Sequence, residues 1–483
     1  MNKKQVFNPY LPLYEYIPDG EPHVFDGRVY VYGSHDHFGA FDFCFNDYVT
    51  WSAPLDDLSD WRYEGVIFRK NQDPMNPKGK RCLFAPDVCR AKDGKYYLFY
   101  AFDWLGLIGV AVSDSPAGPF EYHGLVHYPN GELLGREKDK SKRCFQFDPG
   151  VLVDDDGRAY LYTGFGCVNT FPQILPTGGK VDGCYAMELG DDMLTIVDGP
   201  RKVLGKKTQM NGTPFEGHEF FEASTIRKFN GKYYLGYSSI NGHELCYSVG
   251  DTPYGPFEYK GTLVSNGDVF LNGRAKKDAV NPLGNTHGGI VKVGDDYYVF
   301  YHRHTNFTNT DRQGCAEKLE LDENGDFKQA ECTCCGLNGG PLKGVGEYPA
   351  SICSKMLPKK GNIFYPFFAM PWQKGNMMIT QSGKDEDTVE TQYIKNINDG
   401  GIVGYKYFDL KKTKEAGLEL DGNFKGEIVM KLGEEELGKA EVALKKGEKQ
   451  IVKIAMKPSK EIKELTFTFN GKGKANFYKL ILA

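Results

Sequence analysis

The sequence has no long hydrophobic run, since none of its segments approaches 18 consecutive apolar residues, the length that a membrane-spanning helix requires. Its charge has no strong sign either, because 59 lysines and arginines face 64 aspartates and glutamates, for a net charge of −5. We therefore expect neither nucleic acid nor a membrane as partner. The first twenty residues contain no apolar stretch of signal-peptide length before prolines appear, which predicts a cytoplasmic protein.

The sequence also lacks the cysteine spacing of a zinc site. It contains 12 cysteines, of which Cys332, Cys334 and Cys335 form a cluster, but no second pair follows at zinc-ligand spacing. Without an export signal, we expect all of them to be free thiols, buried as small apolar side chains or weakly exposed.

A motif of strand, tight turn and strand occurs five times in the first part of the chain. The clearest copy is FFEASTIRKFNGKYYLGY from Phe220, whose Asn-Gly pair favours a β-hairpin. A tyrosine marks each copy, at intervals of roughly 63 to 74 residues, which suits the four strands of one propeller blade. We therefore predict a five-bladed β-propeller. The tyrosines are Tyr30, Tyr97, Tyr160, Tyr234 and Tyr298.

The composition changes near residue 340, so we predict two domains in this all-β chain of 483 residues. Glycine and aromatic residues dominate before that point, whereas lysine and glutamate alternate with apolar residues from Lys355 onward. The alternation is typical of antiparallel strands in a sandwich. We expect the propeller to span residues 1–340 and a jelly-roll-like β-sandwich to span residues 341–483.

An ionisable residue stands about 10 to 12 positions before each repeated tyrosine. If this position begins the innermost strand of each blade, the five side chains meet at one end of the central axis. A single acidic residue there is typical of a turn, but four carboxyls and a histidine in one register indicate a polar pocket. The residues are Asp19, Asp87, Asp148, Glu222 and His287.

Carboxyl groups around a pocket suit glycoside hydrolysis, in which one carboxyl protonates the leaving oxygen while another attacks the sugar or activates water. A third carboxyl can raise the pKa of the acid by like-charge repulsion. Aromatic faces suit sugar rings, and Phe38, Trp104 and Phe165 follow the tyrosine strands, near the expected pocket mouth. Packing between blades explains these aromatic residues equally well.

Five motifs in this order resemble glycoside hydrolase family 43, of the β-xylosidase and α-L-arabinofuranosidase type, across about residues 8–335. The resemblance implies an inverting mechanism. It also implies that Asp19 is the general base, that Glu222 is the general acid, and that Asp87 orients the acid and tunes its pKa. The motifs are PDGEPHVFDGRVYVYGSHD, FAPDV, FDPGVLVDDDGRAYLY, FFEASTIRKFNGKYYL and NTHGGIVKVGDDYYVFYHRHT.

Two of these roles have rival residues. The proline that the family places directly after the base follows Glu21 in this chain, so Glu21 rivals Asp19. Glu216 and Glu219 lie close to Glu222 in the sequence, although a solvated loop face is the ordinary place for such residues.

The resemblance also bears on the rest of the pocket. It implies a histidine, here His287, near a central cation that is commonly calcium, whereas the chemistry itself requires no cofactor. A lone histidine at a strand start is otherwise a structural residue. We expect Arg312 to reach the sugar hydroxyls where the bond breaks, and Asp148 to contact the substrate.

The tail from Tyr393, YIKNINDGGIVGYKYFDL, resembles a family 6 carbohydrate-binding module. Such modules need exposed aromatic residues, and this tail has few. Tyr393, Tyr405 and Tyr407 suit a core equally well, so we favour a docked, stabilising sandwich over an active sugar binder.

We therefore predict an inverting exo-glycosidase that releases terminal L-arabinofuranose or D-xylose from short plant-derived oligosaccharides, as in xylan degradation. One alternative is a non-catalytic carbohydrate-binding propeller. Another is a retaining fructan-type hydrolase on the same scaffold, whose two carboxyls would lie about 5 to 5.5 Å apart rather than about 6.5 to 9.5 Å. Oligomeric state has no signature in this sequence.

Overall fold

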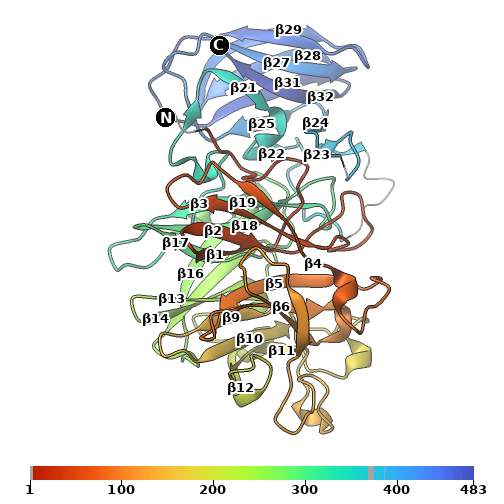
Figure 1. Ribbon diagram of the computed structural model, residues 1–483. Coiled ribbons are helices and arrows are strands. Elements are labelled where there is room, and N and C mark those ends of the chain that lie inside the picture. Colours follow the sequence, from red (N-terminus) through yellow and green to blue (C-terminus); the bar gives the residue numbers. More distant parts are fainter. Residues whose placement is uncertain (1–3, 368–374, 386) are drawn as a thin grey trace.

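The structure is a computed structural model that describes residues 4–367, 375–385 and 387–483. It consists of a ring of β-sheets, drawn in red to green in Figure 1, and a β-sandwich in blue that lies above the ring. The fold class predicted from the sequence is confirmed.

Each of the first four blades is an antiparallel sheet of four strands in chain order, and the fifth sheet has three described strands. Blade 1 contains β1 (Glu21–Phe25), β2 (Arg28–Tyr32), β3 (Tyr48–Pro54) and β4 (Arg62–Phe68). Blade 2 contains β5 (Leu83–Arg90), β6 (Tyr96–Phe102), β7 (Ile108–Ser113) and β8 (Glu121–Leu125). Blade 3 contains β9 (Gly150–Val153), β10 (Ala159–Gly166), β11 (Asp182–Leu189) and β12 (Ile196–Gly205). Blade 4 contains β13 (Phe220–Phe229), β14 (Lys232–Ser239), β15 (Glu244–Gly250) and β16 (Glu258–Ser265). Blade 5 contains β17 (Ile290–Val293), β18 (Asp296–His304) and β19 (Arg312–Leu319).

The first strand of every blade lies at the centre of the ring. Strand β1 contacts β5, β5 contacts β9, β9 contacts β13, β13 contacts β17, and β17 returns to β1. A bridge between Gly20 and Gly288 joins blades 1 and 5 beside this closure. An apolar cluster fills each of the five junctions between neighbouring blades, so residues before the first strands converge on one axis.

The repeated tyrosines all lie on the second strand of a blade, as the repeat predicts. The predicted turn at Asn230 and Gly231 is also present, because Phe229 pairs with Lys232 across it. Both turn residues have positive φ, 51° and 78°, which the tightest β-hairpins require.

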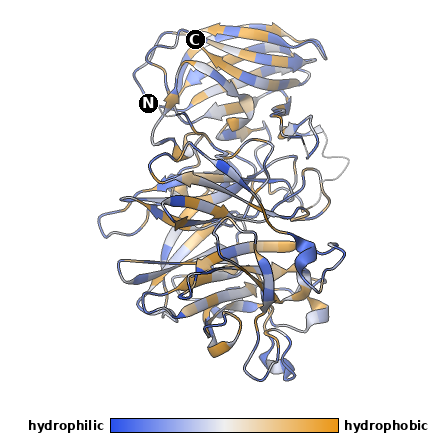
Figure 2. Cartoon of the chain, viewed as in Figure 1, coloured by the Kyte–Doolittle hydropathy of each residue, from blue (hydrophilic) through white to orange (hydrophobic). Residues whose placement is uncertain are grey.

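The sandwich consists of two larger sheets and a two-stranded pair that share one apolar core. Apolar and polar residues alternate along its strands in Figure 2, as expected when one face of each sheet is buried. Its first strands are β20 (Leu342–Lys343), β21 (Gly346–Pro349), β22 (Lys355–Leu357), β23 (Met378–Gln381), β24 (Gln392–Ile397), β25 (Gly401–Tyr405) and β26 (Phe408–Asp409). The others are β27 (Glu415–Gly422), β28 (Lys425–Leu432), β29 (Glu435–Ala443), β30 (Gln450–Ala455), β31 (Leu465–Lys472) and β32 (Ala475–Leu482).

The tyrosines singled out in the tail occupy different surroundings. Tyr405 is fully buried in the sandwich core. Tyr407 is partly buried, and its hydroxyl donates to Glu331 at 2.6 Å. Tyr393 stacks on Tyr478 with ring centroids 4.8 Å apart. Sugar binding by the sandwich stays a prediction.

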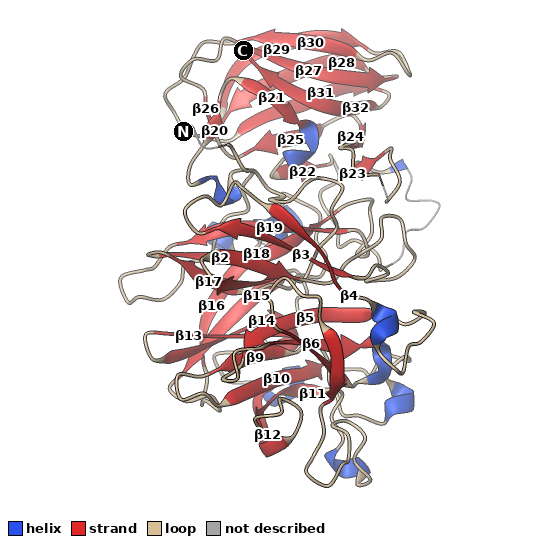
Figure 3. Ribbon diagram, viewed as in Figure 1, coloured by secondary structure: helices blue, strands red, loops and turns tan. Residues whose placement is uncertain are grey.

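The helical segments in the part of the chain that the structure describes are short 3-10 turns, drawn in blue in Figure 3. None of them is long and apolar enough to cross a membrane. All 12 cysteines are free thiols, and all of them except Cys82 and Cys144 are buried. The turns are η1 (Lys70–Gln72), η2 (Asp103–Leu105), η3 (Lys140–Lys142), η4 (Leu175–Thr177), η5 (Lys207–Gln209), η6 (Asn266–Asp268), η7 (Leu271–Gly273), η8 (Lys276–Asp278), η9 (Gly336–Asn338) and η10 (Ala350–Ile352).

Candidate active site

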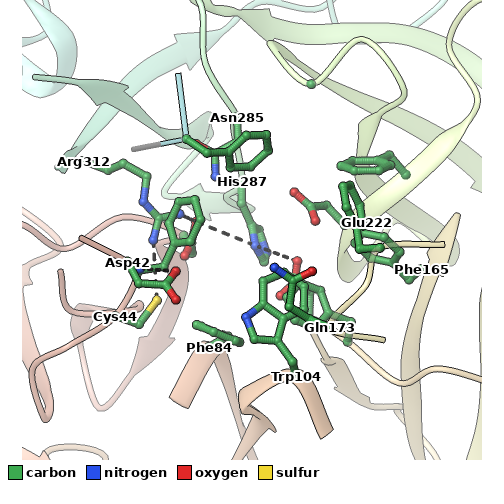
Figure 4. A pocket seen from close by; sticks show the side chains of 18 of the residues that line it. Asp42, Cys44, Phe84, Trp104, Phe165, Gln173, Glu222, Asn285, His287 and Arg312 are labelled. Atoms are coloured by element: carbon green, nitrogen blue, oxygen red, sulfur yellow. Dashed lines mark hydrogen bonds and ion pairs between the residues drawn. The ribbon is translucent and has the colours of Figure 1, made fainter. Parts of the chain in front are cut away.

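A cavity of about 310 Å³ opens at one end of the propeller axis, lined by residues of all five blades and of the second domain. Seven of the nine predicted site residues line it, and Figure 4 shows several of them pointing into one space. Asp87 and Phe38 are absent from the lining. The seven are Asp19, Trp104, Asp148, Phe165, Glu222, His287 and Arg312.

The backbone of the repeat aims these side chains. Asp19, Asp148 and His287 each stand four residues before the residue that pairs with the repeated tyrosine of their blade. Asp19 and Asp148 have positive φ, 55° and 44°, and so do Ala85 and Ala223 at the same register in the other two blades, at 37° and 67°. Such strained conformations cluster at functional sites. In blade 4, the residue that enters the cavity is one position earlier, at Glu222.

Asp87 lies deeper in the hub than the cavity. It stands two positions beyond Ala85, the blade 2 residue in register with Asp19, and a strand rises about 3.3 Å per residue. Its carboxylate lies 2.5 Å from His23 Nε2 and accepts the backbone N–H of Val151 at 2.8 Å. The predicted placement of Asp87 beside the acid is therefore wrong. The count of 10 to 12 positions back from the repeated tyrosine covers both Ala85 and Asp87, and only Ala85 is in register with Asp19.

Glu21, the rival base, belongs to the same deeper layer. It is 1% exposed, and its Oε2 accepts Arg227 Nη2 at 2.5 Å and the Thr225 hydroxyl at 2.8 Å. Arg227 also lies 3.8 Å from Asp87. Burial alone would raise the pKa of Asp87, but the charges of His23 and Arg227 outweigh it and lower the pKa. Charges beneath the cavity are thus paired with one another.

Asp19 is held by two groups from blade 5. Arg312 Nη1 donates to its Oδ1 at 2.9 Å, and the guanidinium is itself fixed by Asp36, which accepts from Nε at 2.8 Å and from Nη2 at 2.9 Å. His302 Nδ1 accepts the backbone N–H of Asp19 at 3.3 Å, and its Nε2 donates to the Asn285 carbonyl. The Asp19 carboxylate is therefore fixed in orientation at the cavity floor.

Glu222 and Asp148 are two further carboxyl groups that line the cavity. Burial, followed by the charge of Asp148, raises the pKa of Glu222 well above its ordinary range. Burial also raises the pKa of Asp148 to about 7, with Asp19 adding to the effect and His287 opposing it. Asp148 Oδ2 accepts the N–H of Ala223, next to Glu222, at 3.1 Å. Glu222 is thus suited to carry a proton at neutral pH.

His287 lies between the carboxylates, and in Figure 4 it separates Arg312 from Glu222. Its ring nitrogens are 4.0 Å from Asp19, 3.7 Å from Asp148 and 3.5 Å from Glu21. Burial alone would lower the pKa of His287, but these three carboxylates outweigh it and raise the pKa to about 9. A protonated His287 is therefore a fixed cation among the acids.

The remaining predicted residues lie outside the cavity. Phe38 packs against Tyr16, with ring centroids 5.5 Å apart, so its predicted place at the mouth is wrong. Glu216 is exposed and accepts the N–H of Gly212 at 2.8 Å, as a loop residue does. Glu219 is 1% exposed rather than solvated, and neither rival acid lines the cavity.

Sequence reasoning missed several lining residues. Phe84 and Phe147 line the cavity next to the strained register position of their blades, and Phe221 lines it two residues before Ala223. The repeated phenylalanine of FAPDV, FDPGV and FFEAS was therefore a readable signal. Phe147 stacks on Trp104, with ring centroids 5.4 Å apart and an interplanar angle of 16°. Other lining residues had no such signal. They are Asp42, Phe43, Cys44, Phe171, Pro172, Gln173, Gly242, Asn285, Phe364 and Phe367.

Comparison with known proteins adds to this geometry. The model of glycosyl hydrolases family 43 matches residues 20–327. This chain belongs to that family. It is therefore a glycoside hydrolase, as the motifs predict.

A sequence relative and a solved structure resemble this family 43 enzyme over most of the propeller or more. This chain is 45% identical over 488 residues to a xylosidase/arabinosidase of Thermoclostridium stercorarium, and the match covers 99% of each chain. A solved β-xylosidase/α-arabinofuranosidase from a compost microbial metagenome, in complex with xylotriose and in a calcium-free form, is 29% identical with a TM-score of 0.51. That match covers 66% of this chain and 96% of the other.

A third relative resembles both domains together. The arabinoxylan arabinofuranohydrolase of Bacillus subtilis, solved with cellotetraose, covers 99% of this chain and 97% of its own, at 21% identity and a TM-score of 0.50. At that identity the likeness concerns the fold alone.

Proposed function

We propose that this enzyme is an exo-acting glycosidase that inverts the anomeric carbon and releases a terminal L-arabinofuranose or D-xylose from short plant-derived oligosaccharides. The observation that carries the proposal is the meeting of Asp19, Asp148 and Glu222, from three blades, in one aromatic-lined cavity. A volume of about 310 Å³ is at the lower end for small-ligand sites, which favours one terminal sugar over a polymer chain. The relative named a xylosidase/arabinosidase supports the choice of pentose.

In the proposed mechanism, Glu222 and Asp19 act in a single step. Glu222, protonated because burial and Asp148 raise its pKa, gives its proton to the leaving oxygen. Asp19, oriented by Arg312, takes a proton from a water molecule as that water attacks the anomeric carbon from the opposite face. The role of orienting the acid and tuning its pKa, predicted for Asp87, is assigned in this mechanism to Asp148, which lies in the cavity and raises the pKa of Glu222.

Stereochemistry tests this mechanism directly. Proton NMR of the first-formed sugar, recorded before mutarotation with xylo- and arabino-oligosaccharides, reports both the pentose and its anomer. Inversion is expected, because the proposed base activates water rather than attacking the sugar. A product of retained configuration would instead favour the fructan-type alternative, and membership of a hydrolase family argues against the non-catalytic one.

A structural calcium at the propeller centre is a further part of the proposal. Its support is the buried ion pair of Glu21 Oε1 and His287 Nε2, which lie 3.5 Å apart and have no other hydrogen-bond partner among the described residues. Glu21 Oε1 would be the protein ligand, and water would complete most of the shell, since calcium takes six to eight oxygens. His287 would then have to be neutral. A higher melting temperature in calcium than in a chelator supports the ion, and equal temperatures contradict it.

We also propose that the enzyme works in the cytoplasm on imported oligosaccharides. A cavity sized for a terminal sugar suits short substrates that can enter a cell. Activity in the soluble cell fraction is expected, and activity confined to the culture medium would contradict this location.

A further inference from the structure

A short segment of the second domain, residues 363–367, crosses onto the propeller. The N–H of Leu283 donates to the carbonyl of Ile363 at 3.1 Å, and the N–H of Tyr365 donates to the carbonyl of Leu283 at 2.7 Å. These bonds form a parallel bridge between Leu283 and Phe364. The segment is therefore fixed by its backbone to the loop that leads into His287.

Asn309 of blade 5 connects this segment to the cavity. Its backbone N–H donates to the Pro366 carbonyl at 3.0 Å, and its Nδ2 donates to the Tyr365 carbonyl at 2.5 Å. Its Oδ1 accepts the N–H of Asn285 at 3.0 Å. Asn285 lines the cavity and accepts from His302, which holds Asp19. The segment is thus a few hydrogen bonds from the proposed base.

Two aromatic side chains of the segment line the cavity. Phe364 packs against Gly242, where an added Cβ would lie 3.1 Å from the ring. Phe367 meets Phe43 edge to face, with ring centroids 6.2 Å apart and an interplanar angle of 83°. Phe43 in turn lies 4.9 Å from the guanidinium of Arg312. Since Phe367 is 51% exposed, it lies at the rim, where a leaving sugar would be.

A second contact from the same domain holds a propeller loop. Asp385 Oδ1 accepts the N–H of Phe38 at 2.6 Å, and its Oδ2 accepts Asn46 Nδ2 at 2.9 Å. These two bonds fix both ends of residues 38–46, which carry Asp42 and Phe43 into the cavity. The side chain of Asp385 is 11% exposed, so its contact with the loop is largely shielded from solvent.

We propose that the second domain completes the sugar-binding pocket: Phe364 and Phe367 form the wall that contacts the leaving sugar, and Asp385 positions the loop that carries Asp42 and Phe43. The substrate class is a short pentose oligosaccharide, so this inference rests on the proposed function. In this arrangement the sandwich selects substrate at the active site rather than at a separate site of its own.

The test of the aromatic wall compares a substrate that has a leaving sugar with one that has none. Xylobiose and β-xylosyl fluoride form such a pair, as do an α-L-arabinofuranosyl xylobiose and the corresponding fluoride, and the pair used is the one that the wild-type enzyme cleaves. Phe367→Ala is expected to lower kcat/KM for the oligosaccharide about tenfold, mainly through KM, and to leave the fluoride nearly unchanged. Ile363→Ala is the matched control, since Ile363 lies on the same segment, is 55% exposed and does not line the cavity.

The outcomes separate this inference from the proposed function. Equal effects of Phe367→Ala on both substrates, or none on either, would overturn the aromatic wall. A wild-type enzyme that cleaves no pentoside of the panel would instead remove the proposed function on which the wall depends.

Asp385→Asn tests the positioning role separately. It weakens the hold on the loop without removing bulk, so KM is expected to rise several-fold for both substrates while the melting temperature changes little. Asp387→Asn is the control, because Asp387 lies on the same loop and accepts only the N–H of Lys384 among its described contacts. An unchanged KM in Asp385→Asn, or an equal rise in Asp387→Asn, contradicts the positioning role.

Discussion

Blades 2 and 3 begin with nearly the same five residues, FAPDV at 84–88 and FDPGV at 147–151, and use them differently. In both, the phenylalanine lines the cavity and the next residue, Ala85 or Asp148, has positive φ. Blade 3 places its carboxylate at that strained position, in the cavity. Blade 2 places it two residues later, at Asp87, where it pairs with His23. The repeat sets the backbone, and a shift of two residues decides whether a carboxylate lies in the cavity or in the hub beneath it.

We expect the largest loss of activity from substitution of Glu222, the residue whose pKa Asp148 raises. Glu222→Gln removes the proton donor, so kcat/KM for unactivated oligosaccharides should fall about a thousandfold. Nitrophenyl pentosides should lose less, because nitrophenolate leaves without a proton, and sugar binding by calorimetry should persist. Glu216→Gln, in an exposed turn shortly before β13 and outside the cavity lining, serves as the control. Wild-type turnover in Glu222→Gln would remove Glu222 from the mechanism.

Asp148→Asn tests the carboxylate of blade 3. Without its negative charge the pKa of Glu222 falls, and each unit of that fall leaves a roughly tenfold smaller protonated fraction on the basic side. We expect kcat/KM at neutral pH to drop at least about tenfold. Steady-state kinetics on an oligosaccharide measure it, and an unchanged rate would mean that Asp148 does not act on the acid.

Asp87→Asn tests the carboxylate of blade 2, where stability rather than chemistry should change. It leaves the buried charge of Arg227 and the buried ring of His23 with one partner fewer, which we expect to cost about 3 kcal/mol of the free energy of unfolding in urea. Asp148→Asn is the matched comparison. Because burial of Asp148 disfavours its charge, its loss should leave stability unchanged or higher. Equal destabilisation by both variants contradicts the division between cavity and hub.

Much of the fold could be predicted because its signals are local. A tyrosine and a tight turn recur in every blade, so Asp19, Asp148 and His287 fall into register by counting. Asp87 does not, because the counted window of 10 to 12 positions also admits a residue two places after the register position, which in blade 2 is Ala85, and because an irregularity interrupts β5 between Phe84 and Asp87. Counting from one landmark cannot detect a displacement of two residues.

The contribution of the second domain could not be predicted for a different reason. Phe364 and Phe367 belong to no repeat, and their place in the cavity depends on how the sandwich docks on blade 5. Asp385 likewise has no motif, since its partners, Phe38 and Asn46, lie more than 300 positions away in the sequence. Contacts of this kind follow from the tertiary structure alone.

The pH dependence of kcat/KM in the paired variants Asp148→Asn and Asp87→Asn tests the central claim most directly. A raised pKa keeps Glu222 protonated to higher pH, so wild-type activity should fall only as pH rises through that value. Removing the negative charge of Asp148 lowers the pKa and should move the basic limb of the profile to lower pH, whereas Asp87→Asn should leave it in place. A limb that moves in Asp87→Asn and stays in Asp148→Asn would contradict the account.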